Sequence, residues 1–332
     1  MPSTLSVADA HALVAGILAA NGCGERLARV VAEAVVAAER DGATSHGFFR
    51  LPGYVADLAN GWVDGRAEPV VEDAVPGLVR VDAANGYAQV ALADGRDRLV
   101  AKACTQDIAA LAIRNSHHFA ALWTDVEPLA EAGLVAFAFG NGRSRVVPFG
   151  LFGTNPMAFA CPRRNGPPMV WDQASSMMAH GEVMLAAMHG KPIPEGAGFD
   201  AAGRPTTAAD AVLAGGALGP FGGYKGSAIA LMVELMGGAL TGGDLGFEDR
   251  SGAFTGAQSS SAGEYLVAID PARSGGGAFL DRTEALFQRL TRDGARLPGD
   301  RRYVNRARAL AEGIRIEPEQ LDALKRLRAS SG

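Results

Sequence analysis

The chain has 332 residues, of which 48% are hydrophobic and 20% charged, and its formal net charge is −5 at pH 7. This length exceeds what one core usually organises, so we expect two lobes of unequal size. The acidic balance provides no positive field for nucleic acid or an anionic membrane, and we expect neither as a partner. The first twenty residues lack the positive flank of a signal peptide, which favours a soluble cytoplasmic protein.

The cysteines and histidines do not have the spacing of a metal site. Cys23, Cys104 and Cys161 stand far apart, which argues against a disulfide framework or a structural zinc ion. We expect each to be a small buried apolar side chain. The histidines form neither an HxxxH nor an HExxH pattern, so we predict no metal.

Apolar spacing predicts helices at both ends of the chain. One helix is expected to begin after the N-cap Ser6 and to stop at Asn21, and a second is expected from Glu25 to Arg40. Residues 225–240 form a long, almost uncharged helical stretch that should lie in the core or in a subunit interface. Three further helices are predicted at 280–290, 302–311 and 318–328, the last packing back on the N-terminal helices.

The middle of the chain alternates between helical and strand patterns, which predicts a mixed α/β fold. Short apolar runs bounded by turn residues predict strands at 78–81, 108–113, 134–139 and 157–160. No GxGxxG follows a strand, because Gly140-Asn141-Gly142 continues into Arg-Ser-Arg. A dinucleotide would therefore have to bind through a scaffold other than the Rossmann fingerprint.

Four of the six histidines lie in segments rich in small residues, namely His46, His117, His118 and His180. The ordinary pKa of histidine is near neutrality, so such a residue suits proton delivery to a substrate. Each could equally be a hydrogen-bonded structural side chain.

His46 and Arg50 are four residues apart and would share one face if residues 47–51 are helical. A proton donor would then stand beside an arginine fork suited to a carboxylate. The alternative is a surface arginine with a capping Ser-His pair. Ser45 has no GxSxG elbow, which favours an orienting role over a nucleophilic one.

Other charged residues are weaker candidates when each is considered alone. Asp172 and Glu182 could complete a proton relay, although a lone acid in such a segment is usually a cap or turn residue. Arg301 and Arg302 follow a turn and suit a phosphate group, although a solvated basic turn is equally natural.

Four motifs taken together resemble the type 2 malate/L-lactate dehydrogenase family over nearly the whole chain. They lie at Asp41–Gly47, Arg114–Phe119, Gly153–Pro156 and Gly222–Gly226. Within that family, the segments 51–54, 117–123 and 297–302 look most like the Δ1-piperideine-2-carboxylate/Δ1-pyrroline-2-carboxylate reductases.

The resemblance implies a non-Rossmann NAD(P)-binding fold around a predominantly antiparallel sheet, with helical N- and C-terminal segments packed together. It implies a helical, substrate-side domain of residues 1–115 and 281–332, and a cofactor-binding domain of residues 116–280. It further implies a homodimer with sites near the subunit interface and NADPH as hydride donor, with NADH left open.

The resemblance also assigns roles to individual residues. Ser45, His46 and Glu182 take the catalytic positions, with His46 donating the proton. Substrate-binding positions fall on Arg50, Thr154, His180 and Gly181. The positions that contact the cofactor are His118, Phe119, Ala120, Ala121, Leu122, Asp172, Gln173, Ala174, Tyr224, Lys225, Arg296, Leu297, Pro298, Gly299, Asp300, Arg301 and Arg302.

The chain departs from its relatives at three places. Glu182 stands where the reductases that the chain resembles have an aspartate, and Tyr224 stands where they often have a histidine. The link from residue 147 to Thr154 is shorter than theirs, and it borders the substrate threonine. We therefore expect the pocket to differ in shape.

The activity implied is reduction of a cyclic imine bearing a 2-carboxylate, giving L-pipecolate or L-proline. An alternative is a dehydrogenase that interconverts 2-oxo and 2-hydroxy acids with the same residues. A third reading is an inactive metabolite-binding relative, against which the intact Ser45, His46, Arg50 and Lys225 argue.

Overall fold

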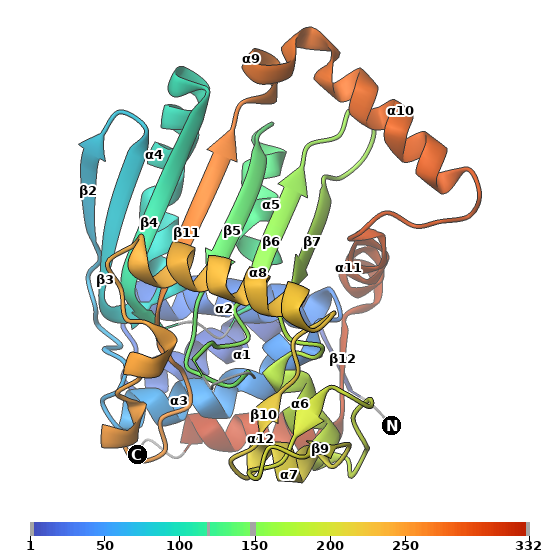
Figure 1. The fold of residues 1–332 in the computed structure, drawn as a ribbon. Coiled ribbons are helices and arrows are strands. Elements are labelled where there is room, and N and C mark those ends of the chain that lie inside the picture. Colours follow the sequence, from blue (N-terminus) through green and yellow to red (C-terminus); the bar gives the residue numbers. More distant parts are fainter. Residues whose placement is uncertain (1–2, 118–119, 147–150, 330–332) are drawn as a thin grey trace.

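A seven-stranded sheet forms the centre of the computed structural model, which describes residues 3–117, 120–146 and 151–329. The strand order is β2-β3-β4-β11-β5-β6-β7 (Figure 1). Neighbouring strands are antiparallel except β3 and β4, which are parallel. The predominantly antiparallel sheet predicted from the sequence is confirmed. The strands are β2 (Val70–Val75), β3 (Leu78–Tyr87), β4 (Ile108–His117), β5 (Val135–Gly140), β6 (Met157–Cys161), β7 (Met169–Gln173) and β11 (Ser261–Ile269).

Helices cover both faces of this sheet. The parallel pair β3 and β4 needs a crossover, which α4 (Ala88–Gln106) provides. On the same face α5 (Trp123–Glu131) packs against β5, β6 and β7. The opposite face is crossed by α8 (Tyr224–Glu234) and by the π-helical turn Leu235–Ala239 that follows it (Figure 1).

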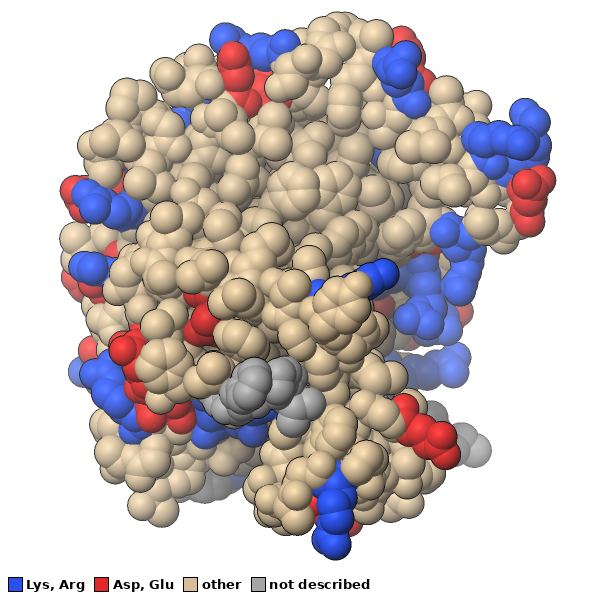
Figure 2. Space-filling view, viewed as in Figure 1, with Lys and Arg blue, Asp and Glu red and all other residues tan. Residues whose placement is uncertain are grey.

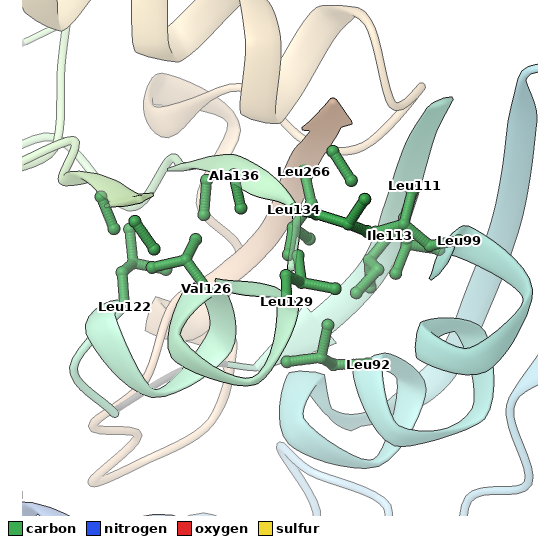
Figure 3. Close-up of a cluster of buried hydrophobic side chains, with 14 of the residues drawn as sticks. Leu92, Leu99, Leu111, Ile113, Leu122, Val126, Leu129, Leu134, Ala136 and Leu266 are labelled. Carbon is green, nitrogen blue, oxygen red and sulfur yellow. The ribbon is translucent and has the colours of Figure 1, made fainter. Parts of the chain in front are cut away.

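The main core lies between the sheet and the helices α4 and α5 (Figure 3). Leu92 and Leu99 from α4 meet Leu111 and Ile113 from β4, and Leu129 comes from α5. Leu111 and Ile113 share one side of the strand because side chains alternate along it. This packing holds the ends of β4 and β5 in place, and the residues of the candidate site lie near those ends.

The N-terminal and C-terminal helices form a second core. It joins α1 (Val7–Ala20), α2 (Glu25–Arg40), α3 (Leu51–Ala59) and α12 (Pro318–Ala329). Asn21 Nδ2 donates to the Leu327 carbonyl at 2.9 Å, and β1 (Ser3–Leu5) pairs with β12 (Ile314–Ile316). The predicted packing of the two ends against each other is confirmed.

A small third cluster packs beside these two cores. Its buried members include Val146, Val183 and Leu218. The remaining elements are α6 (His180–Met188), β8 (Gly198–Phe199), β9 (Pro205–Thr206), α7 (Ala209–Leu213), β10 (Ala217–Leu218), α9 (Pro271–Gly275), α10 (Phe279–Thr291) and α11 (Asp300–Glu312).

Most predicted elements are present, with one correction. Cys104 is exposed on α4, so the expectation that all three cysteines are buried is wrong. The predicted helix 225–240 is α8 followed by a π-helical turn, with Ala230 and Val233 buried on one side and Leu231 and Leu235 exposed on the other. The strands β2, β7 and β11 and the helix α4 were not predicted. The proposed domain boundary after residue 115 falls inside β4, and the division into two domains stays a prediction. None of the described helices is long and apolar enough to cross a membrane.

A buried ion cluster ties α2, α5 and α11 together. Arg306 Nη2 lies 2.6 Å from Asp41 Oδ2 and 2.7 Å from Glu127 Oε2. Arg40 adds a second guanidinium at 2.6 Å from Asp41. Because the Asp41 carboxylate is fully buried, it depends on these cations for compensation.

Arg306→Met should destabilise the protein by about 3 kcal/mol, because it leaves the buried Asp41 and Glu127 carboxylates short of a cation. Urea unfolding measures the loss. Arg308→Met on the same helix is the matched control, since Arg308 is exposed and donates to the Asn305 side chain at the surface. It should change stability by less than about 0.5 kcal/mol. Equal losses in the two variants would contradict this account.

Candidate active site

Two adjoining cavities lie where β4, β5, α6 and the segment after α2 meet. We call the one of about 140 Å³ the inner cavity and the one of about 690 Å³ the outer cavity. Both are lined by the predicted site residues His46, Arg50, Thr154 and His180. The structure thus brings together residues that are up to 134 positions apart in the sequence.

The segment carrying the predicted proton donor consists of two short 3-10 turns, Thr44–His46 and Phe48–Arg50. The continuous helix considered for residues 47–51 is absent, because α3 begins only at Leu51. Gly47 separates the turns with φ −93° and ψ −137°. A side chain there would collide with Glu39 on α2, so close packing requires glycine at this position.

His46 and Arg50 are joined through Ser45. Ser45 Oγ lies 3.0 Å from His46 Nδ1, and the Ser45 carbonyl accepts a hydrogen bond from Arg50 Nε at 2.8 Å. Arg50 also packs against Met184 and the ring of Phe49. Burial lowers the pKa of Arg50, yet a guanidinium stays charged at neutral pH. The arrangement combines a titratable imidazole with a cation facing the same small cavity.

Glu39 supports this segment from behind and was not predicted. Its Oε2 accepts a hydrogen bond from the Phe48 backbone at 2.8 Å. Burial raises the pKa of Glu39 to about 7, although the hydrogen bond from Phe48 lowers this pKa in part. A partly buried acid on a helix has no sequence signature, because only the fold shows what it faces.

Thr154 is positioned by a buried polar network. The next residue, Asn155, has φ 37° and donates through Nδ2 to Glu234 at 2.7 Å. Glu234 also accepts from Asn141 Nδ2 at 3.1 Å and from the Gly246 backbone at 2.6 Å. The network explains why an asparagine follows the threonine in the Gly-Thr-Asn-Pro motif.

His180 begins α6 and contacts an arginine. Arg145 Nη1 donates to His180 Nε2 at 2.9 Å, which leaves the imidazole proton on Nδ1 because a guanidinium can only donate. Burial, with the charges of Arg145, Arg50 and Arg143, lowers the pKa of His180 to about 3. His180 is therefore neutral at physiological pH. Gly181 follows it, and a side chain there would meet the Arg50 guanidinium.

Glu182 lines the outer cavity with Ser45 and His46. Its Oε2 accepts a hydrogen bond from the Ala179 backbone at 3.1 Å, so the carboxylate caps the N-terminus of α6. This cap uses one of the two carboxylate oxygens of Glu182. The relay role stays a prediction.

Many predicted cofactor positions line the outer cavity. They are Ala120, Ala121, Leu122, Asp172, Gln173, Ala174, Arg301 and Arg302. Arg302 stacks over the Trp123 ring at 4.9 Å and lies 3.3 Å from Asp172 Oδ1. Burial raises the pKa of Asp172, whereas Arg302 opposes that shift. The wall therefore combines apolar surface with cations.

Other predicted cofactor positions do not line these two cavities. Tyr224 and Lys225 are exposed at the start of α8, next to Phe221, which does line the outer cavity. The linings also lack Arg296, Leu297, Pro298, Gly299 and Asp300. Of these residues, Leu297 packs in a small core with Cys161 and Phe287. His118 and Phe119 lie outside the described residues. Their cofactor roles remain predictions.

Several residues around the inner cavity were not predicted. They include Arg143, Arg145 and the backbone segment 258–260, which Asp57 holds by accepting from the Gln258 and Ser259 amides. In the sequence, the signal for the two arginines was the Arg-Ser-Arg run after Gly142. His117 is structural, because its ring bonds Ser259 and Asn85 and burial lowers its pKa to about 4. Among the described residues, no group of three potential metal ligands occurs.

Comparison with known proteins agrees with this geometry. Residues 5–325 match the family described as malate/L-lactate dehydrogenase. The chain belongs to the malate/L-lactate dehydrogenase family. The resemblance predicted from the sequence is confirmed.

Three relatives illustrate the similarity. A Δ1-pyrroline-2-carboxylate/Δ1-piperideine-2-carboxylate reductase of Pseudomonas putida is 50% identical, with 98% of each chain covered. A (2R)-3-sulfolactate dehydrogenase (NADP(+)) of Chromohalobacter salexigens is 43% identical, again over 98% of each. The crystal structure of Δ1-piperideine-2-carboxylate reductase from Pseudomonas syringae has a TM-score of 0.95 at 50% identity, covering 98% of this chain and 99% of that one. The fold is thus that of this dehydrogenase family.

Glu39 makes stability depend on pH. Its pKa is raised from 4.5 to about 7, so between these values the folded chain binds more protons than the unfolded chain. The resulting stabilisation, at most about 3 kcal/mol, is complete below pH 4.5 and lost as the pH rises through 7. Glu39→Gln should remove this part of the pH dependence.

Melting temperatures of parent and Glu39→Gln between pH 5 and pH 8 test the expectation. The parent should lose stability relative to the variant as the pH rises. Glu33→Gln, at an exposed position of the same helix, should follow the parent. A constant difference between parent and Glu39→Gln would refute the assignment.

Proposed function

We propose that this protein reduces small cyclic imines that carry a carboxylate on the imine carbon. The substrates are Δ1-piperideine-2-carboxylate and Δ1-pyrroline-2-carboxylate, and the products are L-pipecolate and L-proline. The observation that carries the proposal is that His46 and Arg50 line one small cavity and are linked through Ser45. The 50% identical reductase of Pseudomonas putida supports this substrate class.

Each side chain has a task that its contacts suit. The Arg50 fork holds the substrate carboxylate with two parallel hydrogen bonds, and Thr154 lines the same cavity. Ser45 engages His46 Nδ1, so proton delivery to the ring nitrogen falls to Nε2. Holding the carboxylate fixes the imine carbon in place, which is the main contribution that positioning makes to such a reaction.

The outer cavity suits a nicotinamide nucleotide. Its volume of about 690 Å³ and its cations, Arg301 and Arg302, fit a large ligand that carries phosphates. A reduced nicotinamide bound there would supply the hydride for the imine carbon. We propose NADPH as the preferred cofactor, with NADH as the alternative, and the NADP(+)-dependent sulfolactate dehydrogenase relative supports this choice.

A second candidate activity is the interconversion of 2-oxo and 2-hydroxy acids. The family match and the 43% identical sulfolactate dehydrogenase favour it. The same residues would serve, because a ketone oxygen also needs a proton and a 2-oxo acid also carries a carboxylate for Arg50. The two activities differ only in the atom that His46 protonates.

We further propose that the protein is a cytoplasmic homodimer that associates through the outer side of α8. Leu231, Leu235 and Leu240 are each about half exposed there, and Tyr224 is exposed as well. Figure 2 shows few charged side chains over the middle of this face, whereas charges gather towards its margins. An apolar surface of this kind is typical of an interface between subunits.

His46→Ala should lower kcat by about 10²- to 10⁴-fold with little change in the cofactor KM, because a positioned general acid contributes this much. Oxidation of NADPH and NADH is measured with piperideine-2-carboxylate, pyrroline-2-carboxylate, pyruvate and oxaloacetate in parallel. The imines should be turned over fastest. Faster reduction of the oxo acids would favour the second candidate, and a normal kcat in His46→Ala would show that another group delivers the proton.

Replacing Leu231 and Leu235 together by Glu should convert the dimer into a monomer, because two charges cannot be buried in an apolar interface without partners. Sedimentation velocity gives the mass of parent and variant. Leu286→Glu, at an exposed position of α10, is the control and should leave the mass unchanged. A monomeric parent would exclude the proposed interface.

A further inference from the structure

The peptide that joins the turns of His46 and Arg50 rests on one acidic side chain. Phe48 donates its backbone N–H to Glu39 Oε2 at 2.8 Å, and Gly47 packs so closely on Glu39 that a side chain there would collide with it. Gly47 stands between the 3-10 turn that ends at His46 and the one that ends at Arg50. Glu39 therefore contacts the backbone at the point that decides how the two turns are placed relative to each other.

The hydrogen bond from Phe48 is a contact whose strength depends on a proton. Gly47 has no side chain that could cap the second turn, so the Glu39 carboxylate takes the place of a cap at its start. An ionised carboxylate accepts a backbone N–H in a hydrogen bond roughly twice as strong as a neutral acceptor does. A protonated carboxyl group also needs a partner for its own O–H. Ionised Glu39 therefore holds Phe48 more firmly than protonated Glu39.

Burial, and not a neighbouring charge, sets the proton affinity of Glu39. Burial raises its pKa to about 7, and among the described residues the shift has no contribution from a charged neighbour. Glu39 lines a groove behind the two turns, in which the charged or titratable side chains are Arg50, His189, Glu317 and Glu319. On the other elements around it, these groups are Asp9 and His11 on α1, Tyr54 and Asp57 on α3, and the ion cluster of Arg40, Asp41, Glu127 and Arg306. The carboxyl group thus changes its charge within the physiological pH range.

A titratable group in this position has a cost and a use. Ionisation of Glu39 costs folding stability because the charge is buried, as the pH dependence described above states. Groups with a pKa shifted in this way are most common at functional sites. The turns that Glu39 holds carry His46 and Arg50, to which the proposed function assigns proton transfer and carboxylate binding.

We propose that Glu39 is a positioning residue for the Arg50 clamp, and that the substrate binds best when Glu39 is ionised. The ionised carboxylate fixes the start of the second turn, so that the guanidinium at the end of that turn meets the substrate carboxylate in the correct orientation. A proton on Glu39 loosens this start and weakens substrate binding. The inference rests on the proposed function for the role of Arg50 and adds a control of that role by pH.

Steady-state kinetics at pH 6 and pH 8 tests the proposal on the imine or oxo acid that the parent reduces. Glu39→Gln keeps a hydrogen-bond acceptor without the charge. Its substrate KM should exceed that of the parent about threefold to tenfold at pH 8, and should equal it within about twofold at pH 6. Its kcat should stay within about twofold of the parent at both pH values, because His46 remains able to donate a proton.

Two further variants serve as controls. Glu39→Asp is the conservative variant, and it should recover part of the low KM at pH 8 because it keeps a carboxylate that can ionise. Glu33→Gln, at an exposed position of the same helix, should follow the parent. Titration of the substrate is common to all these proteins and cancels when their KM values are compared. A KM ratio of Glu39→Gln to parent that is the same at both pH values would overturn the proposal, as would a loss of kcat alone.

Binding of a ligand that cannot be reduced measures the coupled proton directly. Pyrrole-2-carboxylate is ionised throughout this pH range, so a proton that is exchanged on its binding comes from the protein. Calorimetry at pH 7 is carried out in two buffers with different ionisation enthalpies. The parent should release up to about half a proton more than Glu39→Gln, because binding favours the ionised form of Glu39.

The outcomes of this experiment separate the inference from the proposed function. Equal proton exchange in the parent and in Glu39→Gln refutes the positioning role alone. A parent that shows the difference, yet reduces neither imine nor oxo acid, refutes the proposed function alone. A parent that does not bind pyrrole-2-carboxylate refutes both, because each relies on Arg50 to hold a carboxylate.

Discussion

The contact of Arg306 with Asp41 and Glu127 joins the three parts of the chain that form the site. Asp41 ends α2 and leads into the turns that carry Ser45 and His46. Glu127 belongs to α5, whose first residue is Trp123, and Arg306 belongs to α11, which carries the outer-cavity residues Arg301 and Arg302. Arg302 and Arg306 both lie over the Trp123 ring. An N-terminal turn, a central helix and a C-terminal helix are thereby held in one arrangement.

Close approach of backbones is the second constraint on the site. A side chain at Gly47 would collide with Glu39, and one at Gly181 would collide with the Arg50 guanidinium. Gly47 has a negative φ of −93°, so lack of space and not a left-handed backbone demands a glycine there. His46 and Arg50 can therefore line one small cavity only because neighbouring chain segments present no side chains at these two positions.

The electrostatics of the inner cavity follow from its position inside the fold. Guanidinium groups keep their charge even when burial lowers their pKa, whereas His180 is neutral because burial and the neighbouring arginines lower its pKa to about 3. The described lining of the cavity thus holds three guanidinium groups, from Arg50, Arg143 and Arg145, and one carboxyl group, from Glu264. Such a field attracts anions and strengthens contacts with them, since water is largely excluded.

The sequence by itself determined the helices whose apolar residues recur regularly, as in Glu25–Arg40, and the short apolar strands. It also determined the family, since several colinear motifs carry their identity locally, and it located Ser45, His46 and Arg50. Only the tertiary structure decided the central strand β11, because its place comes from pairing with β4 and β5, about 120 to 160 residues earlier. It also decided that Glu39 supports the turn of His46, that Glu182 caps α6 and that Arg145 faces the inner cavity. A charged side chain has the same local signature at the surface and in a cavity, and only its neighbours in space distinguish the two.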